Sequence, residues 1–234
     1  MSVEEQDGSQ VRRNTLHYTG NFVAGLYGGH GVLVDQQADT TYEGDFREGQ
    51  RHGRGVLSRT SDGTVLYDGD WVDNQPGGLG TLILPGGHLY TGQVHKGVPE
   101  GHGVCKYVDG AEYEGAWKSG KRNGQGEYIA ASLDEYRGKW VGDVRSGRGV
   151  WQSKRGDRYE GLWDANLPHH EGIMTYNVGS TCTDSSREVE YSGGWKHGKR
   201  NGVGKVTYAD GSVKKGSWKS NDFDDALSDY KPDM

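Results

Sequence analysis

Large apolar side chains return along this chain at almost fixed intervals, and the same glycine and polar positions separate them. A tyrosine begins each stretch, a glycine stands two residues later and a large apolar residue stands four residues later. The tyrosines are Tyr18, Tyr42, Tyr67, Tyr90, Tyr113, Tyr136, Tyr159 and Tyr191. Alternation with a period of two is typical of a strand with one buried face, so each stretch predicts a β-strand.

The spacing also predicts repetition. The tyrosines are 24, 25, 23, 23, 23, 23 and 32 residues apart, and a ninth, degenerate start stands at Lys214 with Trp218 in the aromatic place. We number these nine stretches as repeats 1 to 9. A unit of this length cannot bury a core alone, so neighbouring repeats are expected to stack.

A second glycine pair stands eleven and thirteen residues after the tyrosine, as in Gly124 and Gly126, and only repeat 7 breaks it. These glycines predict a second strand, so that each repeat is one β-hairpin whose rings lie over glycines of the neighbouring strand. Residues 118–123 are expected to form the hairpin loop, and Asp109-Gly110 a tight turn into the next repeat.

The run Tyr-Glu-Gly-Ala-Trp-Lys-Ser-Gly-Lys-Arg-Asn-Gly-Gln-Gly from Tyr113 closely resembles the MORN repeat, and the resemblance extends over about residues 18–218. It implies an all-β fold, an elongated single-layer twisted antiparallel sheet of stacked β-hairpins. Some positions depart from the pattern, namely Asn74, Val94, Asp143, Asn166 and Lys214.

This periodicity sets the expected domain boundaries. Residues 1–14 lack it and are expected to be disordered, whereas 15–220 form the repeat array, with a polar loop insertion at about 177–190. Residues 221–234 form an acidic tail. There, Phe223, Leu227 and Tyr230 have helical spacing behind Asn221, which predicts a short helix that covers the end of the array.

Composition excludes several classes of protein. Only 32% of the 234 residues are hydrophobic, but 41 glycines fit aromatic packing over glycine. No apolar stretch approaches the roughly 18 residues that span a bilayer. A formal charge of −6 argues against nucleic acid as a partner. The start of the chain and its two cysteines, Cys105 and Cys182, predict a reducing cytosol without a disulfide.

Catalytic and metal chemistry find little support in the sequence. Repeated glycines do not form a phosphate-binding loop, the histidines lack a four-ligand spacing, and the acids that follow the tyrosines are expected to face solvent. No nucleophile has a convincing base beside it. We therefore expect no enzyme, no metal and no cofactor.

The aromatic face is the leading candidate for partner binding, because one layer of sheet leaves one side of its rings open to a helix or an extended segment. The same rings could instead serve as the core. The candidate residues are Tyr67, Trp71, Tyr90, Tyr113, Trp117, Tyr136, Trp140, Tyr159, Trp163, Tyr191 and Trp195.

An alternative hypothesis is a peripheral membrane adaptor that binds anionic phospholipids through basic hairpin loops. The residues would be Arg51, Lys121, Arg122, Lys199 and Arg200. Repeats 3, 4 and 7 carry no basic pair there, so the basic stripe is broken.

The resemblance also implies a cellular setting. Stand-alone MORN proteins of this size occur in the cytoskeleton, notably in radial spokes and other axonemal complexes of cilia and flagella, or in cortical structures. A cytoplasmic, non-enzymatic scaffold for protein segments is therefore the expected function, with self-association through free edge strands as a further option. A weaker hypothesis is a regulatory module for a separate enzyme.

Overall fold

The computed structural model describes residues 15–179 and 184–224, and these residues form strands and turns without a helix. The chain divides into two compact units. The N-terminal unit holds residues up to 83 together with 94–97, and the C-terminal unit holds 84–93 and the residues from 98 onward.

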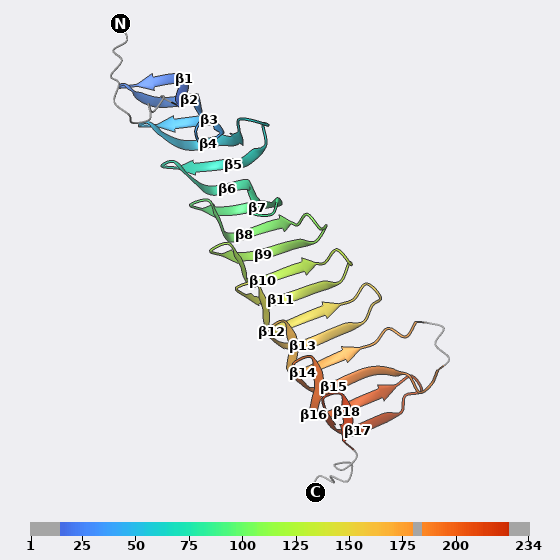
Figure 1. The fold of residues 1–234 in the computed structure, drawn as a ribbon. Helices are drawn as coiled ribbons and strands as arrows, with labels where there is room; N and C mark the ends of the chain where they lie inside the picture. Colours follow the sequence, from blue (N-terminus) through green and yellow to red (C-terminus); the bar gives the residue numbers. More distant parts are fainter. Residues whose placement is uncertain (1–14, 180–183, 225–234) are drawn as a thin grey trace, which may run out of the picture. The chain divides into compact units, whose positions relative to one another are not determined.

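Six strands build the N-terminal unit, and each pairs antiparallel with the next (Figure 1). They are β1 (Leu16–Val23), β2 (Leu26–Asp35), β3 (Thr40–Arg47), β4 (Gln50–Arg59), β5 (Val65–Val72) and β6 (Gln75–Leu84), the last residue of which belongs to the C-terminal unit.

The C-terminal unit continues the same pattern, and from β8 onward each strand pairs antiparallel with the next. The strands are β7 (His88–His95), the last two residues of which belong to the N-terminal unit, β8 (Val98–Lys106), β9 (Glu112–Lys118), β10 (Lys121–Ile129), β11 (Glu135–Val141), β12 (Val144–Gln152), β13 (Arg158–Asp164), β14 (Leu167–Thr175), β15 (Glu188–Lys196), β16 (Lys199–Tyr208), β17 (Val213–Lys219) and β18 (Asp222–Asp224). The prediction of an all-β array of antiparallel hairpins is confirmed.

The hairpin turn is tighter than the sequence predicted. In repeat 5 Lys118 pairs with Lys121, and only Ser119 and Gly120 lie between the strands, with φ of 50° and 77°. Positive φ at both central residues is the geometry of a two-residue type I′ turn. Lys121, Arg122 and the residue after them therefore lie in β10 rather than in a loop.

The glycine at offset eleven serves a β-bulge. Arg122 pairs with Trp117 and Gly126 pairs with Gly115, so three residues of β10 stand opposite one residue of β9. Gly124 lies in this bulge with φ of 89°, a left-handed conformation that glycine adopts without steric cost. In repeat 7 His170 takes this place with φ of 60°.

The glycine at offset thirteen makes room for a ring. A Cβ on Gly126 would lie 2.5 Å from the Cε2 and Cζ atoms of Tyr113, so the tyrosine ring lies directly on this glycine. The Tyr113 hydroxyl donates a hydrogen bond to the backbone oxygen of Ala116 at 2.9 Å. The predicted packing of rings over glycines of the neighbouring strand is confirmed.

Within each unit the rings of successive repeats interleave into an aromatic ladder. Tyr113 packs edge to face on Trp117 of its own repeat at 5.2 Å and on Trp140 of the next repeat at 5.5 Å. The same alternation recurs at Tyr136, between Trp140 and Trp163. Such edge-to-face pairs stabilise by about 0.5–1.5 kcal/mol each beyond the buried area. This ladder is the core of the sheet.

The predicted C-terminal helix is wrong where the structure describes it. Asp222–Asp224 form strand β18, which pairs with β17, and Asn221 has φ of 81° in the turn before it. Phe223 packs edge to face on Trp218 at 5.0 Å, so it ends the aromatic ladder as a strand residue. Leu227 and Tyr230, like the predicted disordered residues 1–14, lie outside the described residues. The predicted insertion at about 177–190 begins after β14, and its last residues, 188–190, lie in β15.

Candidate functional site

One further position lies on the aromatic face, nine residues after each tyrosine, where it pairs with the aromatic residue across the hairpin. Arg122 pairs with Trp117 and Arg145 with Trp140, whereas Pro168 pairs with Trp163. The residues at this position are Tyr27, Arg51, Pro76, Pro99, Arg122, Arg145, Pro168 and Arg200. Arginine or proline thus occupies this position in seven of the eight repeats, and these side chains form a second tier above the rings.

The arginines of this tier stack on rings. The Cζ atom of Arg122 lies 4.3 Å from the ring centre of Trp140, and that of Arg145 lies 4.6 Å from Trp163. A guanidinium over a tryptophan face is attracted by the ring quadrupole, by about 0.5–1 kcal/mol at an exposed site and more when water is excluded. These cations are therefore parts of the packed face.

The turn of the following repeat holds each arginine. The backbone N–H of Arg145 donates to Oδ1 of Asn166 at 2.8 Å, and Nη2 donates to the backbone oxygen of Asn166 at 2.9 Å. Asn74, Asp143 and Asn221 accept the backbone N–H of the other three arginines in the same way, and Arg51 and Arg122 also repeat the Nη2 bond.

These hydrogen bonds between the turn and the arginine explain three of the departures from the repeat pattern. Asn74, Asp143 and Asn166 stand at the mid-turn position where other repeats have glycine, and each follows a repeat that carries arginine. After a proline repeat the position is glycine, as at Gly198, which donates its N–H to the backbone oxygen of Pro168. Proline has no backbone N–H for a side-chain oxygen to accept, so an asparagine would gain nothing there.

The four arginines differ in charge compensation. Nε of Arg122 lies 3.2 Å from Oδ1 of Asp143, and Arg200 forms an ion pair with Glu188. Among the described residues no carboxylate lies within ion-pair distance of Arg51 or Arg145, because Asn74 and Asn166 offer amides instead.

The pKa values of Arg145 and Arg200 follow this difference. Burial lowers the pKa of Arg145, and the nearby Arg122 charge acts in the same direction. Burial also opposes the charge of Arg200, but its hydrogen bonds to Glu188 and Tyr176 outweigh that effect and raise the pKa. Arg145 is thus a cation that the protein desolvates without neutralising.

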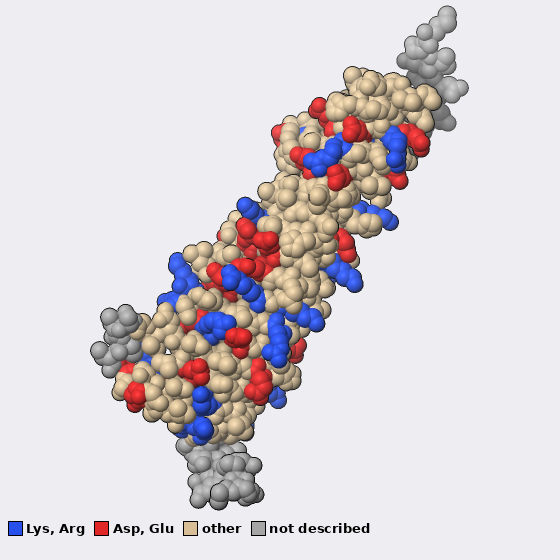
Figure 2. All heavy atoms as spheres, turned by 180° about the vertical axis from the view of Figure 1, so that it is seen from behind, with Lys and Arg blue, Asp and Glu red and all other residues tan. Residues whose placement is uncertain are grey.

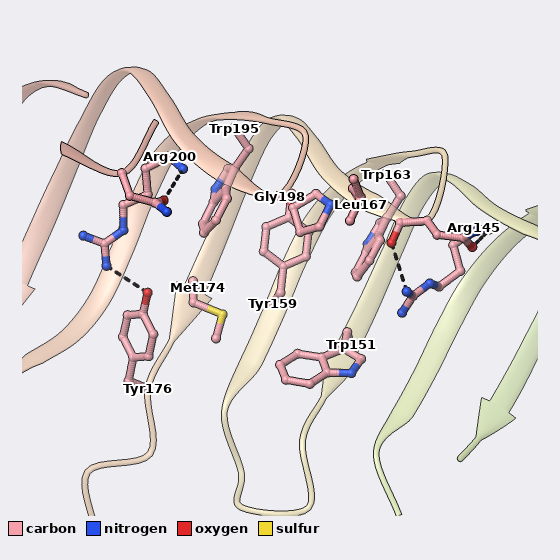
Figure 3. Close-up of a pocket in the computed structure, with 13 residues that line it drawn as sticks. Arg145, Trp151, Tyr159, Trp163, Leu167, Met174, Tyr176, Trp195, Gly198 and Arg200 are labelled. Carbon is pink, nitrogen blue, oxygen red and sulfur yellow. Dashed lines mark hydrogen bonds between the residues drawn. The ribbon is translucent and has the colours of Figure 1, made fainter. Parts of the chain in front are cut away.

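A groove of about 570 Å³ opens on the aromatic face of the C-terminal unit, with Arg145 and Arg200 at its two ends (Figure 3). Repeat 7 lies between these arginines and carries Pro168 at the second-tier position, so no long side chain covers the rings there. The groove is lined by Arg145, Trp151, Tyr159, Trp163, Asn166, Leu167, Pro168, Met174, Tyr176, Trp195, Gly198, Arg200 and Asn221.

The structure places all eleven predicted partner-binding residues in the core, with exposed fractions from 0% for Tyr113 to 8% for Trp195. Three of them, Tyr159, Trp163 and Trp195, also line the groove. The others are Tyr67, Trp71, Tyr90, Tyr113, Trp117, Tyr136, Trp140 and Tyr191, and they support the face from within. Their contact with a partner stays a prediction.

Sequence reasoning missed the half-buried side chains that the groove presents. Trp151 and Met174 stand fifteen residues after their tyrosines, two residues beyond the second glycine of the pair, and Tyr176 stands two residues beyond Met174. The period of two that predicted the first strand would also have placed these residues on the aromatic face.

The basic residues of the lipid hypothesis do not lie in hairpin loops. Arg51, Lys121 and Arg122, as well as Lys199 and Arg200, lie in strands. Only Lys121 and Lys199 are exposed, since the three arginines lie partly buried over rings. On the face that Figure 2 shows, acidic and basic side chains are interspersed. No observation favours a basic surface for lipid.

A second hollow of about 720 Å³ lies on the opposite face of the C-terminal unit and has a floor of glycines. Its charged walls are partly paired: Arg137 lies 2.8 Å from Glu127, whereas Arg148 and Glu171 form no ion pair among the described residues. Glu160, one of the acids predicted to face solvent, is exposed there. The aromatic groove is the stronger binding candidate, because rings and apolar side chains line it, whereas glycines and exposed charges line the second hollow.

Few other reactive or metal-ligating side chains lie close together in the described part of the chain. The His169 ring contacts the rings of His170 and His197, but no group of three ligating side chains in the described residues could hold a metal ion. Cys105 is buried, which raises the pKa of its thiol, and Cys182 lies outside the described residues. None of the described segments forms a helix long and apolar enough to cross a bilayer.

Comparison with protein families gives one clear match. The MORN repeat family matches eight segments, at residues 18–37, 42–64, 67–89, 90–112, 113–134, 136–158, 159–181 and 191–213. These segments begin at the eight tyrosines that open repeats 1 to 8.

Solved structures give weaker likenesses. One is the TCP10 domain of Danio rerio CPAP in complex with a STIL peptide, with 12% identity, a TM-score of 0.34, and cover of 86% of this chain and 100% of that chain. Another is the TCP domain of Drosophila melanogaster SAS-4 in complex with a proline-rich motif of Ana2, with 13% identity, a TM-score of 0.29, and cover of 61% and 85%. At these TM-scores neither likeness carries an inference about this chain.

Proposed function

Because the chain belongs to the MORN repeat family, we propose that it is a non-enzymatic scaffold that binds segments of partner proteins along its aromatic face. The observation that carries this proposal is the groove between Arg145 and Arg200. Its accessible apolar surface comes from the exposed Leu167 and from the half-buried Trp151, Met174 and Tyr176, and it rests on a packed ladder of rings.

The size of the groove suits a stretch of polypeptide. From β12, which carries Arg145, to β16, which carries Arg200, there are four steps between strands. At about 4.8 Å a step these span roughly 19 Å, the length of about six extended residues or about thirteen helical ones. A groove of this length that runs across the strands fits a helix or an extended segment.

The composition of the groove suits tight protein contacts. Tryptophan, tyrosine, methionine and arginine are enriched where protein interfaces gain most of their binding energy. The ring ladder beneath holds Trp163 and Trp195 in place, and their indole N–H groups donate to backbone oxygens of Gly149 and Gly172 at 3.1 Å. A preformed surface loses little conformational entropy when a partner binds.

Two adjacent residues of β14 provide the test, because they lie on opposite faces. Met174 lines the groove, whereas Ile173 lines the opposite hollow. Met174→Asp is expected to abolish co-purification of partners from the source cell, and Ile173→Asp to leave it intact, with both variants folded by circular dichroism. Equal partner capture by wild type and Met174→Asp would refute binding through the groove.

For the cellular setting, we propose the cytoskeleton, with the axoneme of cilia or flagella and its radial spokes as the first place to look. The support is the resemblance to stand-alone MORN proteins. Tagged protein is expected to remain on the axoneme or cortex after extraction with a non-ionic detergent. Release together with the membranes would contradict this setting and favour the lipid-adaptor hypothesis.

A further inference from the structure

Resting on the proposed function, we infer that the groove selects partner segments that carry a carboxylate, and that Arg145 is the residue that receives it. The segment would place an aspartate or glutamate at the β12 end of the groove and apolar side chains toward β16. The groove is thus a polarised site for an acidic, apolar peptide.

The donors of Arg145 are incompletely used. Nη2 donates to the backbone oxygen of Asn166, and the described residues offer no hydrogen-bond acceptor to Nε or Nη1. A guanidinium has five N–H donors in a planar fork that matches the two oxygens of a carboxylate. A ligand carboxylate could therefore form two charge-assisted hydrogen bonds at this end of the groove.

Repeat 5 shows what a carboxylate does at the equivalent place. There Asp143 accepts the backbone N–H of Arg122 at 2.9 Å and the Nε–H at 3.2 Å through the same Oδ1 atom. Asn166 repeats the first of these bonds to Arg145 at 2.8 Å but brings no charge. A partner's carboxylate would supply to Arg145 the compensation that Asp143 supplies to Arg122.

The other end of the groove is already compensated, and this gives the site a direction. Arg200 donates to Glu188 Oε1 at 3.1 Å and to the hydroxyl oxygen of Tyr176 at 2.8 Å. Between the two arginines the walls are apolar, with Trp151, Met174 and Leu167. An acidic residue is favoured at the Arg145 end, and apolar residues are favoured beyond it.

The electrostatics of Arg145 gives a second argument for this assignment. Burial lowers the pKa of Arg145, which reflects a desolvation cost that no carboxylate of the described residues offsets. A ligand carboxylate beside it would offset that cost, whereas a neutral segment would desolvate the cation further. The site therefore discriminates between acidic and neutral segments that have the same apolar side chains.

The test uses the full chain and a displayed library of random short peptides. Peptides selected on wild type and sensitive to Met174→Asp are expected to carry aspartate or glutamate at a fixed place beside apolar residues. Asn166→Asp copies the Arg122–Asp143 pair and keeps Arg145 in position, so it is expected to weaken the selected acidic peptides by roughly tenfold or more. Arg145→Met should weaken them similarly.

Asn74→Asp is the matched control, because it makes the same change beside Arg51, which does not line the groove. It should leave peptide affinity unchanged. Groove-bound peptides without an acidic preference, or with the same affinity for wild type and Asn166→Asp, would overturn the inference while leaving the proposed function standing. A library that yields no Met174-dependent peptide would overturn both.

Discussion

Arg122 and Arg145 occupy equivalent places in neighbouring repeats, stack on equivalent tryptophans and are held by equivalent turns, yet their surroundings differ in charge. Asp143 compensates Arg122, whereas Asn166 leaves Arg145 without a carboxylate. The repeat after Arg122 carries another arginine, whereas the repeat after Arg145 carries Pro168 and opens the groove. The fold is therefore constant while individual substitutions within it decide where a ligand can bind.

High pH should have the largest effect on stability, and it should destabilise the surroundings of Arg122 and of Arg145 together. Burial raises the pKa of Tyr113 and of Tyr136 to about 12. A tyrosine pKa raised by folding means that stability is fully present below pH 10, the usual tyrosine value, and is lost as the pH rises toward 12. We expect cooperative unfolding between about pH 10 and 12, followed by circular dichroism and tyrosinate absorbance. Tyrosinate formation without unfolding would contradict a buried ladder.

Removal of the ring beneath either arginine should cost nearly as much. Trp140→Ala and Trp163→Ala each delete a buried ring of the ladder and are expected to lower the free energy of unfolding by about 3–5 kcal/mol. The measurement is urea denaturation. Val141→Ala, at an exposed neighbour, is the control and should stay within about 0.5 kcal/mol. Tryptophan variants as mild as this control would show that the rings are not the core.

Filling the space under a tyrosine should have an intermediate effect. Gly126→Ala and Gly149→Ala place a Cβ against the rings of Tyr113 and Tyr136, and overpacking of this kind costs about 1–3 kcal/mol. For Gly77→Ala the nearest atom is 3.7 Å away, so it should be nearly neutral. Thermal denaturation distinguishes the three variants. A cost at Gly77 equal to that at Gly126 would mean that backbone effects, rather than ring contact, explain the glycines.

The two arginines themselves should differ by a smaller amount. Arg122→Met removes a stacked side chain and leaves Asp143 without its partner, whereas Arg145→Met removes a desolvated cation that has no carboxylate. We expect Arg122→Met to cost about 1 kcal/mol more in urea denaturation. An Arg145→Met variant that loses more would mean that an acid already compensates Arg145.

Exchange of the turn residues should give the smallest effect and sharpen the comparison most. Asn166→Asp should raise the free energy of unfolding by about 0.5–1 kcal/mol, since it turns a neutral contact into a charge-assisted one, and Asp143→Asn should lower it similarly. Both changes should shrink at high salt. Opposite signs would show that the carboxylate of Asp143 does not stabilise Arg122.

The sequence predicted the repeat architecture because its rules are local. Tyr113, Gly115 and Trp117 alternate with period two in one strand. The position of Gly126 follows because the Tyr113 ring packs on a glycine of the second strand of the same hairpin. Both features depend on residues of one repeat. Local reasoning failed at Phe223. Its helical spacing predicted a helix, but its ring packs on the last ring of the ladder and extends the ladder as part of a strand.

The candidate groove was out of reach because it depends on relations between repeats. Asn166 departs from the pattern of its own repeat, and its role in holding Arg145 became visible only when the strand order placed the two residues side by side. The sequence held the signal, since asparagine or aspartate at the turn always follows arginine one repeat earlier. The burial of Trp140 was also underestimated, because a single layer of sheet was expected to leave its rings open.

One measurement tests most directly whether Asn166 leaves Arg145 able to accept a carboxylate. The arginine Nε–H resonances of the intact protein would be followed by nuclear magnetic resonance while sodium acetate replaces sodium chloride at constant ionic strength. We expect the Arg145 signal to move with acetate and the Arg122 signal, compensated by Asp143, to stay in place. Equal movement of both signals, or movement of Arg122 alone, would contradict the account.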